Sequence, residues 1–322
     1  MEKIIKEPGI YPGVTYEEYA KWDCINNSRL WKLKSTSPMH VKHYIDNPPP
    51  STDALRLGSA MHIQILEPQE FNKRFMVIPK WNMATKDGKA EFQSYAIDLA
   101  TKKVITVAQC DAMVEAKKGK RDLLTQALAL SGREVLDQAE LDTVQSMHRR
   151  LKEQEAYQYI TGRRDSDTEL AIVWDDEVTG LRCKAKIDYA NRDQCILCDL
   201  KSSAGGDFIN ISAAKFSRAA EQHGYHQQAA MYVDGWQALT GDICSFLFIA
   251  AEKEPPHCAC SYEAHDDLLQ CGRNSYRDAL KLWQKCVKED SWPGYNDGKI
   301  VYLQASLWLM EREGVGLHNL TE

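Results

Sequence analysis

Two aspartates and a lysine, Asp188, Asp199 and Lys201, have the residue types and spacing to bind a cation and cleave a phosphate ester. Carboxylate oxygens are the ligands that Mg²⁺ prefers, and the ion is usually held by one or two of them together with water. Lys201 lies two residues after Asp199, so in a strand both side chains point to the same face. A lysine there can orient a water nucleophile and offset the negative charge that develops on the attacked phosphate. Alone, an Asp-x-Lys pair is equally typical of a surface salt bridge.

Three predicted strands must position these side chains: 168–176, 181–190 and 194–203, with turns at 177–180 and 191–193. In the second strand, Arg182, Lys184, Lys186 and Asp188 alternate with apolar residues and share one face. Asp188 and Asp199 are eleven positions apart and need not be adjacent, but a twist or a bulge can bring them together at one edge of the sheet. Two carboxylates held close to each other repel unless a cation lies between them.

The rest of the chain predicts an α/β fold, with one central mixed sheet of about five strands and helices on both sides. Further strands are expected at 103–107 and 243–251. In the N-terminal part, one helix is expected to start at Thr15 and another at Asn27 or Ser28, with a break near Ser37-Pro38 and a loop at 47–53. Further helices are expected at 54–71, within 108–161, and at about 208–221, 223–239 and 268–289. We expect a single domain, 1–322, with an N-terminal helical segment (1–53), a core (54–251) that contains a helical insert (108–161), and a C-terminal helical segment (252–322).

Composition narrows the possible classes of protein. The chain has 322 residues, 43% of them hydrophobic, and a formal net charge of −6, which argues against a large DNA-coating surface but not against a local basic groove. It has no apolar run long enough to span a membrane, and its N-terminus lacks the apolar region of a signal peptide, so a cytoplasmic location is expected. The ten cysteines are expected to be free thiols; the group Cys258, Cys260 and Cys271 contains no CxxC pair, which leaves a metal–cysteine site as the weaker alternative.

Asp188 and the Asp199-Leu200-Lys201 stretch have further motif residues before and after them in the chain. Before them come Gly58-x-x-x-His62 on a predicted helix and Glu169 at the start of a strand, and after them comes Gln228-x-x-x-Tyr232 on a later helix. With these pieces the chain resembles the PD-(D/E)XK nucleases, specifically the RecE-type exonuclease VIII branch, and more distantly the RecB nuclease domain. Ile187 stands where the family motif has proline.

The resemblance implies a restriction-endonuclease-like core and a catalytic set of Lys201, Asp199, Asp188, Glu169 and His62. It implies Mg²⁺ or Mn²⁺ held by Asp188, Asp199, the Leu200 carbonyl and His62, with DNA positioned by Gln228 and Tyr232. Lys186, Tyr225 and His226 are candidates to support these residues. The implied activity is a double-stranded DNA exonuclease that degrades 5′ to 3′ and leaves 3′ single strands for an annealing partner protein. A ring-shaped homo-oligomer and a phage or prophage origin are implied in the same way.

Other functions stay open from the sequence. An endonuclease or a single-strand-specific nuclease can use the same residues, and closed circular DNA separates an endonuclease from an exonuclease, which needs an end. A catalytically silent DNA-binding or assembly protein is a second alternative, which the intact set of Asp188, Asp199 and Lys201 disfavours. A metal-dependent hydrolase of small phosphates is a third, without a supporting motif in the sequence.

Overall fold

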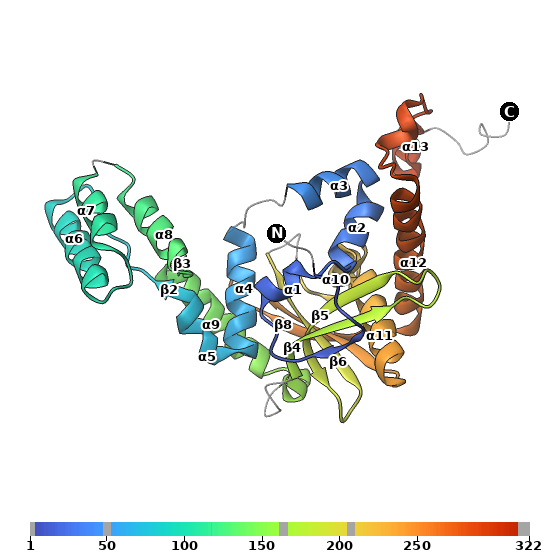
Figure 1. The fold of residues 1–322 in the computed structure, drawn as a ribbon, viewed down its shortest axis with the longest axis horizontal. Helices are drawn as coiled ribbons and strands as arrows, with labels where there is room; N and C mark the ends of the chain where they lie inside the picture. The colour runs from blue at the N-terminus through green and yellow to red at the C-terminus, as the bar shows by residue number, and fades with distance from the viewer. Residues whose placement is uncertain (1–3, 48–52, 117, 161–166, 205–209, 315–322) are drawn as a thin grey trace.

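The computed structural model describes residues 4–47, 53–116, 118–160, 167–204 and 210–314. Within these residues, six strands form one mixed sheet in the order β1-β4-β5-β6-β7-β8, at the centre of the larger body in Figure 1. Neighbouring strands are antiparallel, except for the parallel pair β6 and β7. The strands are β1 (Gly9–Tyr11), β4 (Thr168–Asp175), β5 (Arg182–Asn191), β6 (Ile196–Ser203), β7 (Ser245–Glu252) and β8 (Ala259–Glu263). The predicted α/β class and mixed sheet are confirmed, and β8 is a strand within the segment that was expected to be helical.

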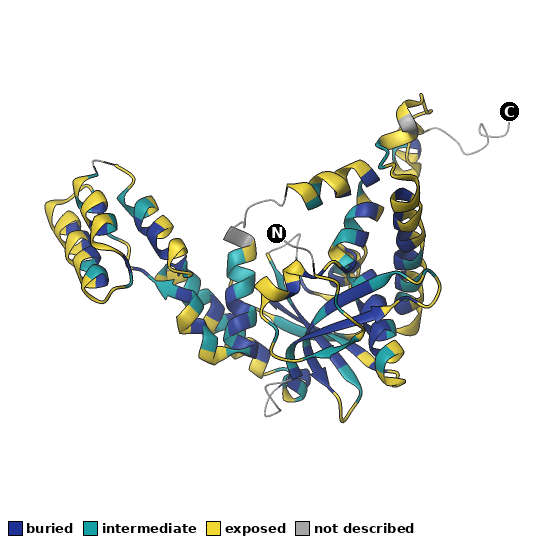
Figure 2. Cartoon of the chain, in the orientation of Figure 1, coloured by how far each residue is buried: buried dark blue, intermediate teal, exposed yellow. Residues whose placement is uncertain are grey.

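Helices cover both faces of this sheet, as the sequence predicted. They are α4 (Asp53–Leu66) and α9 (Gln138–Lys152) on one face, and α10 (Ala213–His223), α11 (Tyr225–Thr240) and α12 (Asp266–Glu289) on the other. Successive side chains of β6 go to opposite faces: Cys198 and Leu200 are buried with α4 and α9, whereas Leu197 is buried with α11 and α12. Figure 2 shows the buried residues gathered along the sheet and on the helix faces that turn toward it. The sheet is therefore a rigid layer between two sets of helices.

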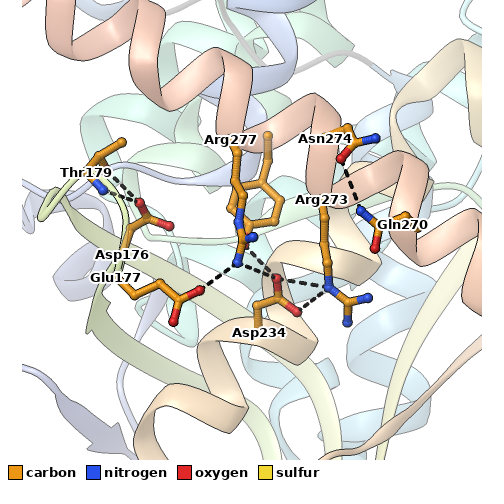
Figure 3. A network of polar contacts seen from close by, with 9 residues as sticks. Asp176, Glu177, Thr179, Asp234, Gln270, Arg273, Asn274 and Arg277 are labelled. Atoms are coloured by element: carbon orange, nitrogen blue, oxygen red, sulfur yellow. Dashed lines mark hydrogen bonds and ion pairs between the residues drawn. The ribbon is translucent and has the colours of Figure 1, made fainter.

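A network of charged side chains fixes α12 against α11, the helix that carries two of the predicted site residues (Figure 3). Asp234 on α11 accepts hydrogen bonds from Arg273 Nε at 2.9 Å and from the Tyr276 hydroxyl at 2.6 Å. Arg277 lies 3.7 Å from the same carboxylate and donates to Glu177 at 2.9 Å, beyond the end of β4. Helix α11 is thus tied both to α12 and to the turn between β4 and β5.

The N-terminal helices begin and end close to the predicted positions. Thr15 caps α1 (Tyr16–Lys21), and its side chain accepts a hydrogen bond from the Glu18 backbone, as expected for this start. Asn26 caps α2 (Asn27–Ser35), one residue before the predicted start. Helix α3 (Pro38–Asp46) then begins at the predicted break, with proline in its first turn. The predicted loop at 47–53 falls mostly outside the described residues.

An arm built from the middle of the chain extends to one side of the sheet (Figure 1). It leaves the body through α5 (Pro68–Arg74), returns through α9, and has its own apolar core, which includes Phe92, Met113 and Leu124. Arg56 of α4 donates to Glu140 of α9 at the base of the arm. The elements of the arm are β2 (Phe75–Val77), α6 (Lys86–Thr101), α7 (Val107–Glu115), α8 (Lys120–Leu130) and β3 (Glu134–Leu136), with β2 and β3 pairing in parallel. A 3-10 turn, η1 (Glu155–Ile160), follows α9, and η3 (Tyr295–Gly298) and α13 (Leu307–Arg312) follow α12.

The strand predicted at 103–107 was wrong. Residues 103–105 form a turn in which Lys103 has a positive φ of 57°, and α7 begins at Val107. Thr106 caps this helix in a reciprocal capping box with Gln109, a local interaction that outweighs the β-branched composition of the stretch. The helices expected at about 208–221 and 223–239 are α10 and α11; residues 208 and 209 lie outside the described residues.

Candidate active site

The site lies where β5 and β6 part. The last paired residues of the β5–β6 ladder are Tyr189 and Cys198, so continuing this register by one residue places Asp188 across from Asp199. At that point the Leu200 N–H donates to Asp188 Oδ2 at 2.7 Å, in place of a strand-to-strand backbone bond. The two strands therefore separate immediately beside the two aspartates, and the sheet opens there.

The neighbouring strand is also irregular at this level. The β4–β5 register runs from Thr168–Tyr189 to Leu170–Ile187, and the intervening Glu169 has a positive φ of 49°. A non-glycine residue in this left-handed region costs about 1–3 kcal/mol, and such strain is concentrated at functional sites. Ile187 is buried with α11 and Tyr189 with α4, so the alternation of β5 is interrupted at Asp188. The strands are thus irregular at the level of the aspartates, although the β5–β6 register by itself already places Asp188 across from Asp199.

Three side chains from three elements form a first group of potential cation ligands. One ligand atom each from His62 of α4, Glu169 of β4 and Asp188 of β5 lies within 4.8 Å of the other two. His62 Nδ1 is 3.4 Å from Asp188 Oδ2, and both side chains are largely buried. Gly58, one helical turn before His62, faces Ser202: a Cβ at this glycine would lie 3.5 Å from the serine hydroxyl. The Gly-x-x-x-His motif therefore lies on the face of α4 that is turned toward the site.

A second group joins β6 to α11. Lys201 Nζ lies 2.7 Å from Asp199 Oδ2 and donates to Gln228 Oε1 at 2.9 Å. Gln228 Nε2 donates to Asp199 Oδ1 at 2.6 Å, so the amide bridges the acid and the base. The ammonium group also lies 4.4 Å above the ring of Tyr225. Tyr232 lies one helical turn beyond Gln228, is 9% exposed and contacts the Gln228 side chain, which suits a supporting position behind the amide.

Burial and neighbouring charges shift the proton affinities of both groups. Burial raises the pKa of Asp188 to about 7; the nearby His62 opposes this rise, and Asp199 and Glu169 add to it. Burial alone would lower the pKa of Lys201, but the charge and hydrogen bond of Asp199 outweigh it and raise the pKa above its usual range. Lys201 is consequently charged at neutral pH. A bound cation would favour the ionised form of Asp188.

The donor set of the first group fits a hard divalent cation. It offers two carboxylates and one imidazole at close range, and carboxylate oxygens are the ligands that such a cation prefers. Asp199 Oδ2 is buried and, among the described residues, has the Lys201 ion pair but no hydrogen bond of good geometry. Asp199 does not belong to the close group of three. Leu200 contacts Asp188 through its backbone N–H and not through the carbonyl that was predicted to bind the cation. Cation binding by Asp199 and by the Leu200 carbonyl stays a prediction.

Glu67 is a further acidic residue of this region that the sequence reasoning missed. It lies at the junction of α4 and α5; burial raises its pKa, and the charge of Glu169 adds to that rise while Lys186 opposes it. In the sequence, Glu67-Pro68 carries only the signal of a helix end. Its closeness to the site depends on how α4 crosses the sheet, which no local pattern reports.

Comparison with known families agrees with this geometry. The model of a family described as a PDDEXK-like domain of unknown function (DUF3799) matches residues 28–306. The chain belongs to this family. The match extends from α2 to the residue before α13, and so includes every residue of both groups at the site. No curated protein matches the sequence.

A solved structure shares the fold of this PDDEXK-like protein. It is the crystal structure of a candidate exonuclease from Eubacterium rectale. The match includes 93% of this chain and 97% of that protein, with a TM-score of 0.56 and 14% sequence identity. An alkaline exonuclease from Laribacter hongkongensis covers 62% of this chain over 97% of its own, with a TM-score of 0.23 and 15% identity. At these identities the first likeness supports the fold alone, and the second is too loose to support an argument. The fold and family are thus those of the PDDEXK-like domains, whereas the RecE-type assignment stays a prediction.

The cysteines do not form a comparable centre. All ten lie in the described part of the chain and are free thiols. Within the described residues, the group of potential metal ligands at the site contains no cysteine, and Cys258, Cys260 and Cys271 belong to no such group. A search of the described helices also finds none that is long and apolar enough to cross a bilayer.

Proposed function

We propose that this PDDEXK-like nuclease is a divalent-cation-dependent exodeoxyribonuclease that hydrolyses linear double-stranded DNA. One observation carries the proposal: Asp188, Asp199 and Lys201 meet where two strands part, with His62 and Glu169 beside the first aspartate. Surface salt bridges do not require interrupted strand pairing, a strained glutamate and a bridging glutamine around them. The arrangement instead suits the in-line attack of water on a phosphodiester.

Each residue has a distinct role in this reaction. Lys201, charged and fixed by Asp199 and Gln228, orients the attacking water and offsets the charge that develops on the phosphate. The His62, Glu169 and Asp188 group would hold Mg²⁺ or Mn²⁺, which supplies water activation and stabilises the leaving oxygen. Gln228 keeps Lys201 and Asp199 in register, since its amide contacts both.

The finer parts of the proposal rest on the resemblance in the motif residues. We propose digestion from 5′ to 3′, which leaves 3′ single strands for an annealing partner protein in recombination. We also propose a homo-oligomer, in the form of a ring around DNA. These statements can fail one by one without loss of the hydrolytic site.

The experiment compares linear duplex with covalently closed circular DNA, in Mg²⁺ or in EDTA, for the wild type and for Lys201→Met. Loss of the linear substrate only, dependent on Mg²⁺ and abolished by the substitution, is the expected result. Nicking of the circle would replace the exonuclease with an endonuclease. A lack of activity on every DNA, including single strands, would favour a silent DNA-binding protein. Labels at the 5′ or the 3′ end report the polarity.

A further inference from the structure

Lys186 is a charged residue of the site that the proposed reaction does not use. It lies on β5 two residues before Asp188, and its ammonium group forms an ion pair with Glu169 Oε2. The two side chains are only 14% and 21% exposed, so water screens this pair weakly. Glu169 is also one of the three groups that could hold a cation together. The same carboxylate is therefore within reach of a fixed lysine and of the cation site.

A lysine in this position and a divalent cation compete for the same charge. An ammonium group that hydrogen-bonds a carboxylate occupies one of its oxygens and neutralises part of its charge. A cation that enters the group must then displace Lys186 from Glu169 or bind without the full charge of this carboxylate.

We propose that Lys186 is a positioning residue that holds Glu169 in the cation-free protein and competes with a divalent cation for its carboxylate. This rests on the proposed function in so far as the group of His62, Glu169 and Asp188 binds the cation. Lys186 thereby sets the cation affinity of the site. It keeps the cluster of carboxylates neutralised until the cation arrives.

The test measures Mn²⁺ binding to the DNA-free protein by titration calorimetry, with no assay of activity. Lys186→Met is expected to bind Mn²⁺ about tenfold more tightly than the wild type, because a charge-assisted hydrogen bond no longer competes. Lys186→Arg retains a cation for Glu169 and is expected to stay within about threefold of the wild type. In a Glu169→Gln background the competition is absent, so adding Lys186→Met should change the affinity by no more than about threefold.

Three outcomes separate the alternatives. Equal or weaker binding by Lys186→Met would overturn the role of Lys186. The same tenfold gain in the Glu169→Gln background would also overturn it, because Lys186 would then act by repulsion through space. If neither the wild type nor any variant binds Mn²⁺, the cation-dependent function itself is overturned. If Lys186→Met fails to fold without cation by circular dichroism, Lys186→Gln replaces it, with the same expected direction.

Discussion

Replacing Lys201 by methionine tests whether the second group at the site is both a structural pair and a catalytic device. Lys201 lies 2.7 Å from Asp199 Oδ2 and 2.9 Å from Gln228 Oε1, and its side chain is 18% exposed. Methionine keeps most of the side-chain volume but removes the charge and all hydrogen bonds. The substitution therefore isolates the ammonium group.

The expected cost in stability follows from the burial of the partner. The Asp199 side chain is 5% exposed, and without Lys201 its remaining hydrogen-bond donor among the described side chains is Gln228 Nε2 at 2.6 Å. Removing one partner of a buried ion pair costs about 3–5 kcal/mol, because the other charge is left uncompensated. Since the amide donor remains, we expect the lower end of that range, about 3 kcal/mol, in the cation-free protein.

The expected cost in activity is larger and has a different origin. Loss of one preorganised donor to the developing charge lowers turnover by about 10²–10³-fold. In the proposed reaction Lys201 also orients the attacking water, so we expect a loss of about 10³-fold, which equals about 4 kcal/mol in the activation free energy. These two losses are separable, because only the first depends on the charge of Asp199.

The double variant Asp199→Asn/Lys201→Met separates them. It leaves a neutral amide in the place of the buried charge, so most of the stability should return while the activity stays lost. Urea unfolding in EDTA, followed by circular dichroism, measures the first quantity, and digestion of end-labelled linear duplex in Mg²⁺ measures the second. The reasoning is refuted if Lys201→Met unfolds within about 1 kcal/mol of the wild type, since the pair would then behave as an exposed one. Retention of wild-type digestion by either variant would refute the catalytic role.

Three further predictions concern the surroundings of this pair. Burial raises the pKa of Asp188 in the folded state to about 7, above that of an unfolded aspartate, so between about pH 4 and 7 the folded state binds one proton more than the unfolded state. The free energy of unfolding in EDTA should therefore fall as pH rises through this window. Asp188→Asn should lose this dependence, and a flat profile in the wild type would contradict the prediction. Gln228→Leu removes the amide that bridges Lys201 and Asp199 and should lower turnover about tenfold to a hundredfold. DNA affinity in Ca²⁺ serves as the control, and unchanged turnover would show that this bridge does not contribute to catalysis. At Gly235 a Cβ would lie 2.7 Å from the Trp174 ring, so Gly235→Ala should destabilise by about 2 kcal/mol in urea unfolding, and an unchanged midpoint would show that α11 can move away from β4.

The sequence predicted the strands of the site because their patterns are local. The alternating side chains of β5 and the apolar start of β6 place both strands to within two residues of their bounds. Strand β7 is apolar from Phe246 to Ala251 because both of its faces are covered, and it was predicted for that reason. Strands β1, β2 and β3 have three residues each and pair with segments far away in the chain, so no pattern of their own revealed them. Strand β8, with five residues, pairs with β7 directly before it, in a segment that was expected to be helical.

The grouping of the site residues was beyond the reach of sequence reasoning for a different reason. The sequence left open how Asp188 and Asp199 would meet, and it did not reveal that Glu169, on the neighbouring strand, has a left-handed backbone. The pattern of apolar residues along a helix or strand describes that single element and not its neighbours in space. The ion pair of Glu169 with Lys186 and the proximity of Glu67 depend on the packing of α4 against the sheet, which is a tertiary property.

The parting of β5 and β6 leaves the site supported from both sides. Strand β6 stays paired with β7 along its whole length, from Ile196 to Ser203, and β5 stays paired with β4 on its other side except at Asp188. Each strand therefore keeps a neighbour on its far side, and Asp188 and Asp199 lie between them with side chains only 13% and 5% exposed. The gap also divides the site, with the potential cation ligands on one side and the lysine with its bridging amide on the other. A phosphodiester that entered the gap would be contacted from both sides at once, and catalytic groups on paired strands can be held to the sub-ångström accuracy that such a reaction needs.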